Sequence, residues 1–83
     1  MYSLKDIDDY LNRLTEEQKE EVVNHANKYD IKPEICAWYN DEEDFLSDWC
    51  HVGYSKEEAL DKLLTEKKEF LQFNDNQIVR FVY

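Results

Sequence analysis

The sequence predicts an α+β fold of four helices and a small three-stranded antiparallel sheet, in the order α-α-β-α-α-β-β. The chain has 83 residues, the length of one domain, so residues 1–83 are expected to form a single acidic α+β domain. It contains one glycine and one proline, so loops should be short and helices should dominate. Residues 70–83 instead hold two apolar runs around a polar turn, a pattern typical of a β-hairpin.

The N-terminal third is expected to form two helices, arranged either as a short hairpin or as one kinked helix. Ser3 is a suitable N-cap, and apolar residues follow it at helical spacing: Leu4, Ile7, Leu11 and Leu14. The segment Thr15–Gln18 has the pattern of a capping box, which predicts a second helix from Glu16 to about Tyr29. The segment Asp30–Pro33 should end this helix, because a proline disfavours helical geometry in the residue before it.

The middle of the chain predicts a strand followed by a helix. The segment Glu34–Tyr39 is short, apolar and bounded by residues that interrupt helices, so it is expected to form a strand. Asn40 or Asp41 should cap a third helix that runs to about Val52 and stops at Gly53. The apolar face of this helix is expected to consist of Phe45, Leu46, Trp49 and Val52.

The C-terminal third predicts a fourth helix and the hairpin. The segment Ser55–Glu58 is a second capping-box pattern, and the helix that follows it should end near Lys67. The hairpin strands are expected at Phe70–Phe73 and Ile78–Tyr83, and the strand around Trp38 should complete the sheet, because an isolated hairpin is marginally stable. All elements are expected to share one core, made of Leu11, Leu14, Val22, Trp38, Phe45, Trp49, Leu60, Leu63 and Phe81.

The charge distribution singles out the middle of the chain. The net charge is −10, from 20 acidic and 10 basic residues. Residues 33–55 contain no lysine or arginine but hold six acidic residues: Glu34, Asp41, Glu42, Glu43, Asp44 and Asp48. On a helix, Asp41, Asp44 and Asp48 would form a row of charges about 5–6 Å apart, a spacing close to that of phosphates along a nucleic-acid strand. If the first two helices pack alongside this row, their acidic residues could extend it: Asp6, Asp9, Glu16, Glu17, Glu20 and Glu21.

Two interpretations of this acidic block stay open. It can be a binding surface for a basic protein, in which Trp38 and Tyr39 supply an aromatic anchor inside the charged rim. It can also be a solvated surface that keeps the protein soluble. Direct binding of nucleic acid is not expected, because neutralising phosphates requires a basic surface.

No catalytic, metal or cofactor site is expected. The residues Cys36, Cys50, His25 and His51 lack both the spacing of zinc ligands and the flanking pattern of a catalytic nucleophile. Both cysteines are expected to be reduced and buried as small apolar side chains. A single glycine is too few for a phosphate-binding loop. No apolar run reaches the length of a membrane span, and the N-terminus has no signal-peptide pattern, so a cytoplasmic location is expected.

The stretch Ala37–Phe45 is similar to a segment of the antirestriction proteins of phages and conjugative elements, in which an alanine–tryptophan strand precedes an acidic, phenylalanine-containing helix. The overall profile also resembles small phage inhibitors, including anti-CRISPR proteins. These resemblances imply DNA mimicry, in which carboxylates occupy the basic channel of a CRISPR effector or a restriction enzyme. Two alternatives stay open: an antitoxin or immunity protein that covers a basic nuclease, and a host protein of unrelated role.

Overall fold

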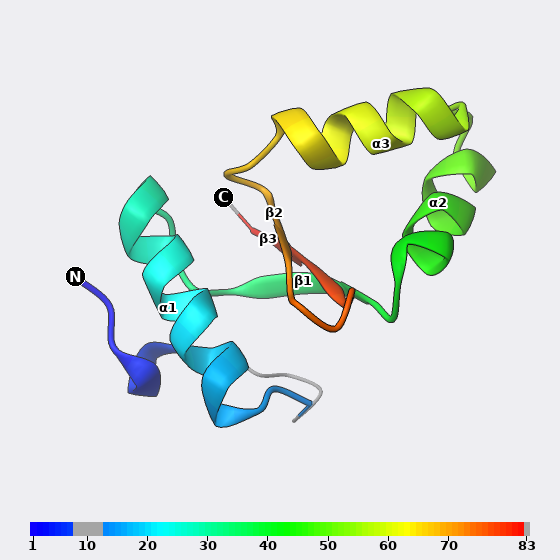
Figure 1. Cartoon of the computed structure of the whole chain (residues 1–83). Coiled ribbons are helices and arrows are strands. Elements are labelled where there is room, and N and C mark those ends of the chain that lie inside the picture. Colours follow the sequence, from blue (N-terminus) through cyan, green and yellow to red (C-terminus); the bar gives the residue numbers. More distant parts are fainter. Residues whose placement is uncertain (8–12, 83) are drawn as a thin grey trace.

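The computed structural model of the chain describes residues 1–7 and 13–82 (Figure 1). It is an α+β fold whose three-stranded antiparallel sheet has the order β1-β3-β2. The strands are β1 (Ile35–Tyr39), β2 (Phe70–Gln72) and β3 (Ile78–Phe81). The C-terminal strand β3 lies in the centre and pairs antiparallel with both neighbours. The three-stranded antiparallel sheet therefore confirms the predicted α+β fold class.

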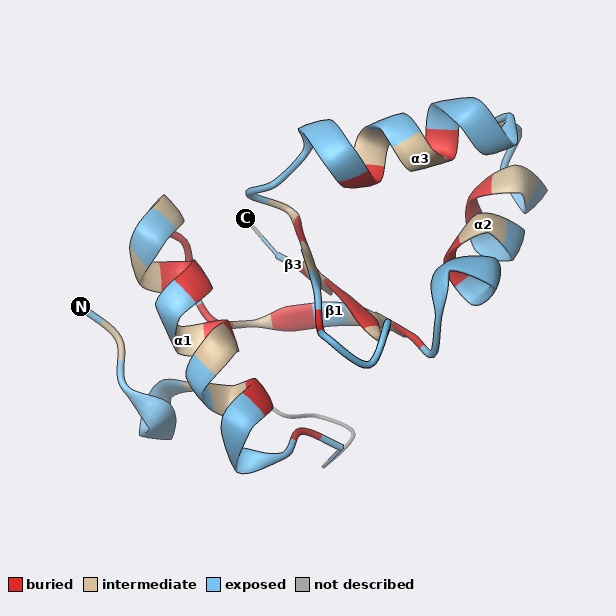
Figure 2. Ribbon diagram, viewed as in Figure 1, coloured by how far each residue is buried: buried red, intermediate tan, exposed pale blue. Residues whose placement is uncertain are grey.

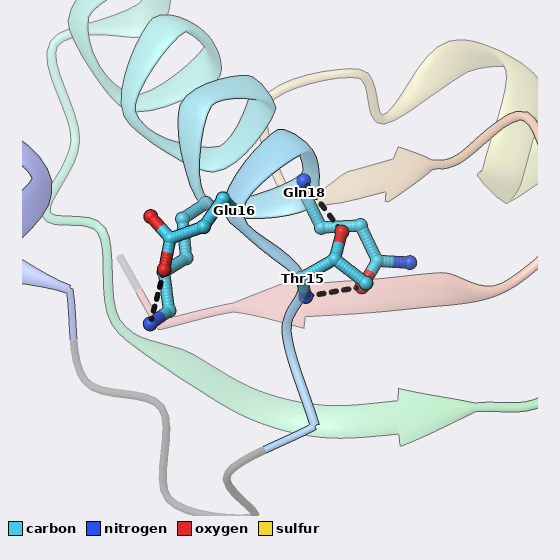
Figure 3. A network of polar contacts seen from close by, with 4 residues as sticks. Thr15, Glu16 and Gln18 are labelled. Carbon is cyan, nitrogen blue, oxygen red and sulfur yellow. Dashed lines mark hydrogen bonds and ion pairs between the residues drawn. The ribbon is translucent and has the colours of Figure 1, made fainter.

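Three helices accompany the sheet in the described part of the chain: α1 (Glu16–Tyr29), α2 (Glu42–His51) and α3 (Lys56–Thr65). Figure 3 shows the start of α1, where the Gln18 N–H donates to Thr15 Oγ1 over 3.1 Å and the Thr15 N–H donates to Gln18 Oε1 over 3.0 Å. This exchange is the predicted capping box. Ser55 and Glu58 form the equivalent pair at the start of α3.

The sheet separates two apolar clusters, because successive side chains of a strand point to opposite faces. On one face, Val22 and Ala26 of α1 pack against Ile35, Val79 and Phe81. On the other face, α2 and α3 pack over the remaining apolar positions of the sheet, in a cluster of Tyr39, Phe45, Trp49, Ala59, Leu63, Phe70 and Ile78. The prediction of a single shared core was therefore wrong. Figure 1 shows the resulting arrangement, with α1 on one side of the sheet and the α2–α3 pair on the other.

In residues 1–7 and 13–15, the described part of this segment, the predicted first helix is not present. Only a 3-10 turn, η1 (Leu4–Asp6), forms in its N-terminal part, and the backbone of Ile7 is already extended. Residues 13–15 are also non-helical, and Leu11 lies outside the described residues. The Ser3 N–H donates to the Asp6 carboxylate over 2.8 Å, which closes a single turn. The apolar residues of the predicted helix lie in different environments. Ile7 packs against the α1 side of the sheet, Leu14 is buried there, and Leu4 is exposed. The number of four helices was therefore wrong.

Several predicted core positions need correction. Leu14, Val22, Phe45, Trp49, Leu63 and Phe81 are buried, whereas Trp38 and Leu60 are only half-buried. Cys36 is exposed and Cys50 is half-buried, so the expectation of two buried cysteines was wrong. Cys36 lies where the β1–β3 register shifts between Ile35 and Ala37, and this irregularity leaves its side chain outside both clusters.

The other boundaries agree with prediction to within two residues. Helix α1 ends at Asp30 in the left-handed conformation, and Gly53 has a φ of 108° directly after α2, as predicted. None of the helices in residues 1–7 and 13–82 has the length and apolar character needed to cross a membrane.

Candidate functional site

A cluster of exposed acidic residues lies at the N-cap and along α2. We define the α2 carboxylate cluster as Asp41, Glu42, Glu43, Asp44 and Asp48, all of which are exposed (Figure 2). Within residues 1–7 and 13–82, no ion pair involves any of these carboxylates. The predicted block of unpaired negative charge thus exists in space over one short helix.

Two members of the cluster also stabilise the helix on which they lie. The Asp44 N–H donates to the Asp41 carboxylate over 2.8 Å, which makes Asp41 the N-cap of α2. The backbone N–H of Asn40 donates to the Asp44 carboxylate over 3.0 Å. Glu42 and Glu43 have no side-chain hydrogen bond or ion pair in the described part of the chain. These two glutamates are therefore the members that a partner can use without competing with a local bond.

Asp48 has a structural role as well, through Tyr39. The Tyr39 hydroxyl donates to the Asp48 carboxylate over 2.8 Å, and the Tyr39 ring meets Phe45 edge-on with centroids 5.3 Å apart. Burial, and next the hydrogen bond and the charge of Asp48, raise the pKa of Tyr39, while Trp49 and Arg80 oppose this. Tyr39 is buried and thus ties α2 to the sheet, so it is not an accessible aromatic anchor.

Breaking the Tyr39–Asp48 tie should reduce stability by an amount that depends on which partner is removed. Tyr39→Phe should cost about 0.5–1.5 kcal/mol, the net value of one hydrogen bond. Asp48→Ala should cost more, about 1–3 kcal/mol, because it leaves the buried hydroxyl without an acceptor. Urea unfolding of both single variants and the double variant measures the coupling. Simple additivity of the two effects would contradict the tie.

Trp38 and Glu34 lie away from the α2 carboxylate cluster. Trp38 points to the α1 face of the sheet, where the Arg13 guanidinium lies 5.2 Å from its ring centroid. Arg13 also donates to Asn40 Oδ1 over 2.8 Å, which places a cation beside the residue that precedes the cluster. Glu34 precedes β1 and is half-buried, so the length of the strand, roughly 16 Å, separates it from Asp41. The eight predicted site residues therefore do not form one surface.

The acidic row could extend over the N-terminal helices only if these packed alongside α2, and α1 does not meet this condition. Helix α1, with its acidic residues Glu16 and Glu17 in the first turn, covers the opposite face of the sheet from α2. Asp6 is exposed in η1, which contacts α1, and Asp9 lies outside the described residues. The negative charge of the α1 region and that of α2 are separate.

An open groove of about 480 Å³ runs along the exposed side of α2. Its lining consists of Glu42, Glu43, Leu46, Ser47, Cys50 and Lys56. The sequence pattern placed Leu46 on the buried face of the helix, and Lys56 was not predicted to belong to the site. The spacing of the residues could have predicted this lining. Residues 42, 46 and 50 are four apart and share one side of a helix, whereas Phe45 and Trp49 share another side. The groove joins part of the acidic cluster to two apolar side chains.

The cysteines and histidines are distributed over both sides of the fold. In residues 1–7 and 13–82, no three His, Cys, Asp or Glu side chains gather closely enough to hold a metal ion. His25 is buried on the α1 face, where it stacks on Phe81 with ring centroids 4.7 Å apart. Its Nε2 lies 3.2 Å from the carbonyl oxygen of Lys68, so a neutral ring with a proton on Nε2 donates to that carbonyl. This contact ties α1 to the turn before β2.

The buried His25 should make the stability depend on pH. Burial lowers the pKa of His25 from its usual 6.5, and the charge of Lys28 acts in the same direction, while the Lys68 carbonyl opposes it. As the pH falls below 6.5, the unfolded chain therefore binds a proton that the folded chain resists, and stability decreases. We expect a lower urea midpoint at about pH 5.5 than at about pH 7.5. His25→Phe should flatten this dependence, whereas His51→Gln, at an exposed position, should retain it; an unchanged slope in His25→Phe would contradict the assignment.

Comparison of the chain with protein-family models, curated proteins and solved structures found no match. The resemblance of residues 37–45 to antirestriction proteins therefore stays an expectation. The candidate functional site consists of the α2 carboxylate cluster and the adjoining groove, together with the contacts that hold them in place.

Proposed function

We propose that the chain is a non-catalytic, cytoplasmic inhibitor, of phage or mobile-element origin, that binds a basic nucleic-acid-binding protein by DNA mimicry. The observation that supports this proposal most strongly is the α2 carboxylate cluster, with one exposed acid at the N-cap of a short helix, four more on that helix, and no ion pair among the described residues. A basic channel that normally binds phosphates would be complementary to such a surface. The partner class is a CRISPR effector, a restriction enzyme or another nuclease.

The local hydrogen bonds of the cluster favour binding, because they hold the charges in place before a partner arrives. Asp41, Asp44 and Asp48 each use one carboxylate oxygen to accept a bond from the chain itself. The second oxygen of each has no hydrogen bond in the described part of the structure. Fixing charged side chains in advance lowers the entropy that is lost when a partner binds. Glu42 and Glu43 add two carboxylates without internal partners.

A displacement experiment tests this proposal. Purified chain is added to complexes of a labelled DNA duplex with members of the three partner classes, and release of DNA is followed by fluorescence anisotropy. We expect release from at least one class, and a steep loss of effect as salt rises, because exposed charges are screened over about 8–10 Å at physiological ionic strength. Inhibition of a nuclease that keeps its DNA bound would instead favour an immunity protein. No release and no inhibition in any class would contradict DNA mimicry.

A further inference from the structure

The groove along α2 combines an apolar floor with charged ends. Leu46 and Cys50 are both half-buried and lie one helical turn apart on the floor. Leu46 also packs against the buried cluster beneath α2, which holds its side chain in place. Glu42 and Glu43 lie at one end of this floor, at the start of α2. The length from Glu42 to Cys50 is about 12 Å, or a little over two helical turns.

The charges of the groove differ between its two ends. The exposed Lys56 opens α3 and lines the groove together with Cys50, beyond the last turns of α2. The two glutamates therefore mark the first turn of α2, and the one lysine marks the side where α2 passes into α3. A ligand that fills the groove needs apolar side chains in its middle and cations at the end that meets the glutamates.

We propose that this groove is the anchor site of the partner-binding surface, and that it takes a basic amphipathic helix of the partner. The inference rests on the proposed function. Arginine or lysine side chains of that helix pair with Glu42 and Glu43, and its apolar side chains, four residues apart, cover Leu46 and Cys50. Interfaces derive most of their affinity from an apolar centre inside a polar rim. Leu46 and Cys50 thus replace Trp38 and Tyr39 as the central contact.

The reactivity of the two cysteines can report whether the groove is occupied. Cys50 lies in the groove, whereas Cys36 is exposed on β1 beside Glu69 and Arg80. A helix bound in the groove covers the first thiol and leaves the second one free. Alkylation by uncharged iodoacetamide, quantified at each cysteine by mass spectrometry, therefore reports groove binding with an internal control in the same molecule.

The probes are three synthetic helical peptides of equal length. The first carries leucines four residues apart and flanking arginines; the second replaces the leucines with serine, and the third replaces the arginines with glutamate. We expect the first peptide alone to slow alkylation of Cys50, at low salt, without changing that of Cys36. Leu46→Ala should weaken its binding, measured by anisotropy of the labelled peptide, by about tenfold. Ser47→Arg, at an exposed lining position, should abolish binding without disturbing the buried cluster.

Two results would contradict the role of the groove as an anchor site, and they differ in what they imply for the proposed function. If the serine peptide binds as tightly as the leucine peptide, or if Leu46→Ala and Ser47→Arg both bind like the parent chain, charge alone attracts the partner. The proposed function then remains and only the groove is wrong. If no peptide protects Cys50, the groove is also wrong, and DNA displacement decides the proposed function separately. A urea unfolding curve of each variant confirms that it is folded.

Discussion

Phe45→Ala is expected to remove a large share of the free energy of unfolding of the protein. Phe45 has no exposed surface and lies at the centre of the cluster beneath α2. Its ring meets Tyr39, Phe70 and Trp49, with centroids 5.3, 5.4 and 6.0 Å apart. Truncating a buried phenylalanine costs about 3–5 kcal/mol, against a total stability of about 5–15 kcal/mol for a whole domain. Circular dichroism in urea measures the loss directly.

The matched control for this prediction is Leu64→Ala. Leu64 lies on α3 and is 68% exposed, so its truncation should change the free energy of unfolding by no more than about 0.5 kcal/mol. Equal destabilisation by the two substitutions would mean that α2 and α3 do not pack on the sheet as described. The comparison also separates a true core effect from a general loss of helix stability.

The elements that the sequence predicts well are those fixed by neighbouring residues. The exchange between Thr15 and Gln18, the equivalent pair at Ser55 and the glycine at 53 act over a few residues. Helix starts and ends that depend on such contacts can be read from the order of residues alone. This explains why the three helices lie within two residues of their predicted bounds.

The elements that the sequence predicts poorly depend on contacts with residues that are distant in the sequence. The stripe from Leu4 to Leu14 has helical spacing, yet Leu4 is exposed while Ile7 and Leu14 pack on the α1 side without forming a helix. Helical spacing indicates which residues can share a face, but burial of that face requires a surface to pack on. The division into two clusters likewise depends on both faces of the sheet being covered, which no local pattern indicates.

The candidate site was predicted in part. The charge of residues 41–48 follows from composition and is visible in the sequence. Trp38 and Tyr39 were placed together, although adjacent residues of a strand point to opposite faces, and the structure separates them accordingly. The capping bond of Asp41 was one of two predicted alternatives. The bonds of Asp44 and Asp48 were not foreseen, because each carboxylate has several polar neighbours and only the folded backbone selects among them.

These bonds decide which charge reversal is informative. Reversing Asp41, Asp44 and Asp48 would remove the N-cap of α2 and the acceptor of Tyr39, so a loss of binding would be confounded by a loss of structure. Glu42→Lys with Glu43→Lys changes the same surface without breaking a side-chain bond in the described residues. We expect this variant to bind a basic partner at least about a hundredfold more weakly, given the coupling energies measured for close charge pairs at interfaces.

Glu16→Lys with Glu17→Lys is the matched control. These residues are the first two of α1, as Glu42 and Glu43 are the first two of α2, so both variants lose acids that favour a helix N-terminus. Each variant raises the net charge of −10 by four units. Glu16 gives up one exposed ion pair, to Lys19 over 3.5 Å, and such pairs contribute little to stability. The control differs from the test variant mainly in its place, on the opposite face of the sheet.

The binding role of the α2 carboxylate cluster is tested most directly by the concentration of each variant that releases half of a labelled DNA duplex from a responsive nuclease, at low salt. We expect the Glu16/Glu17 variant to stay within about threefold of the parent chain, because both retain the α2 carboxylate cluster. We expect the Glu42/Glu43 variant to require at least about a hundredfold more protein. Equal losses in the two variants would mean that only net charge matters. An unimpaired Glu42/Glu43 variant would contradict the binding role of the α2 carboxylate cluster.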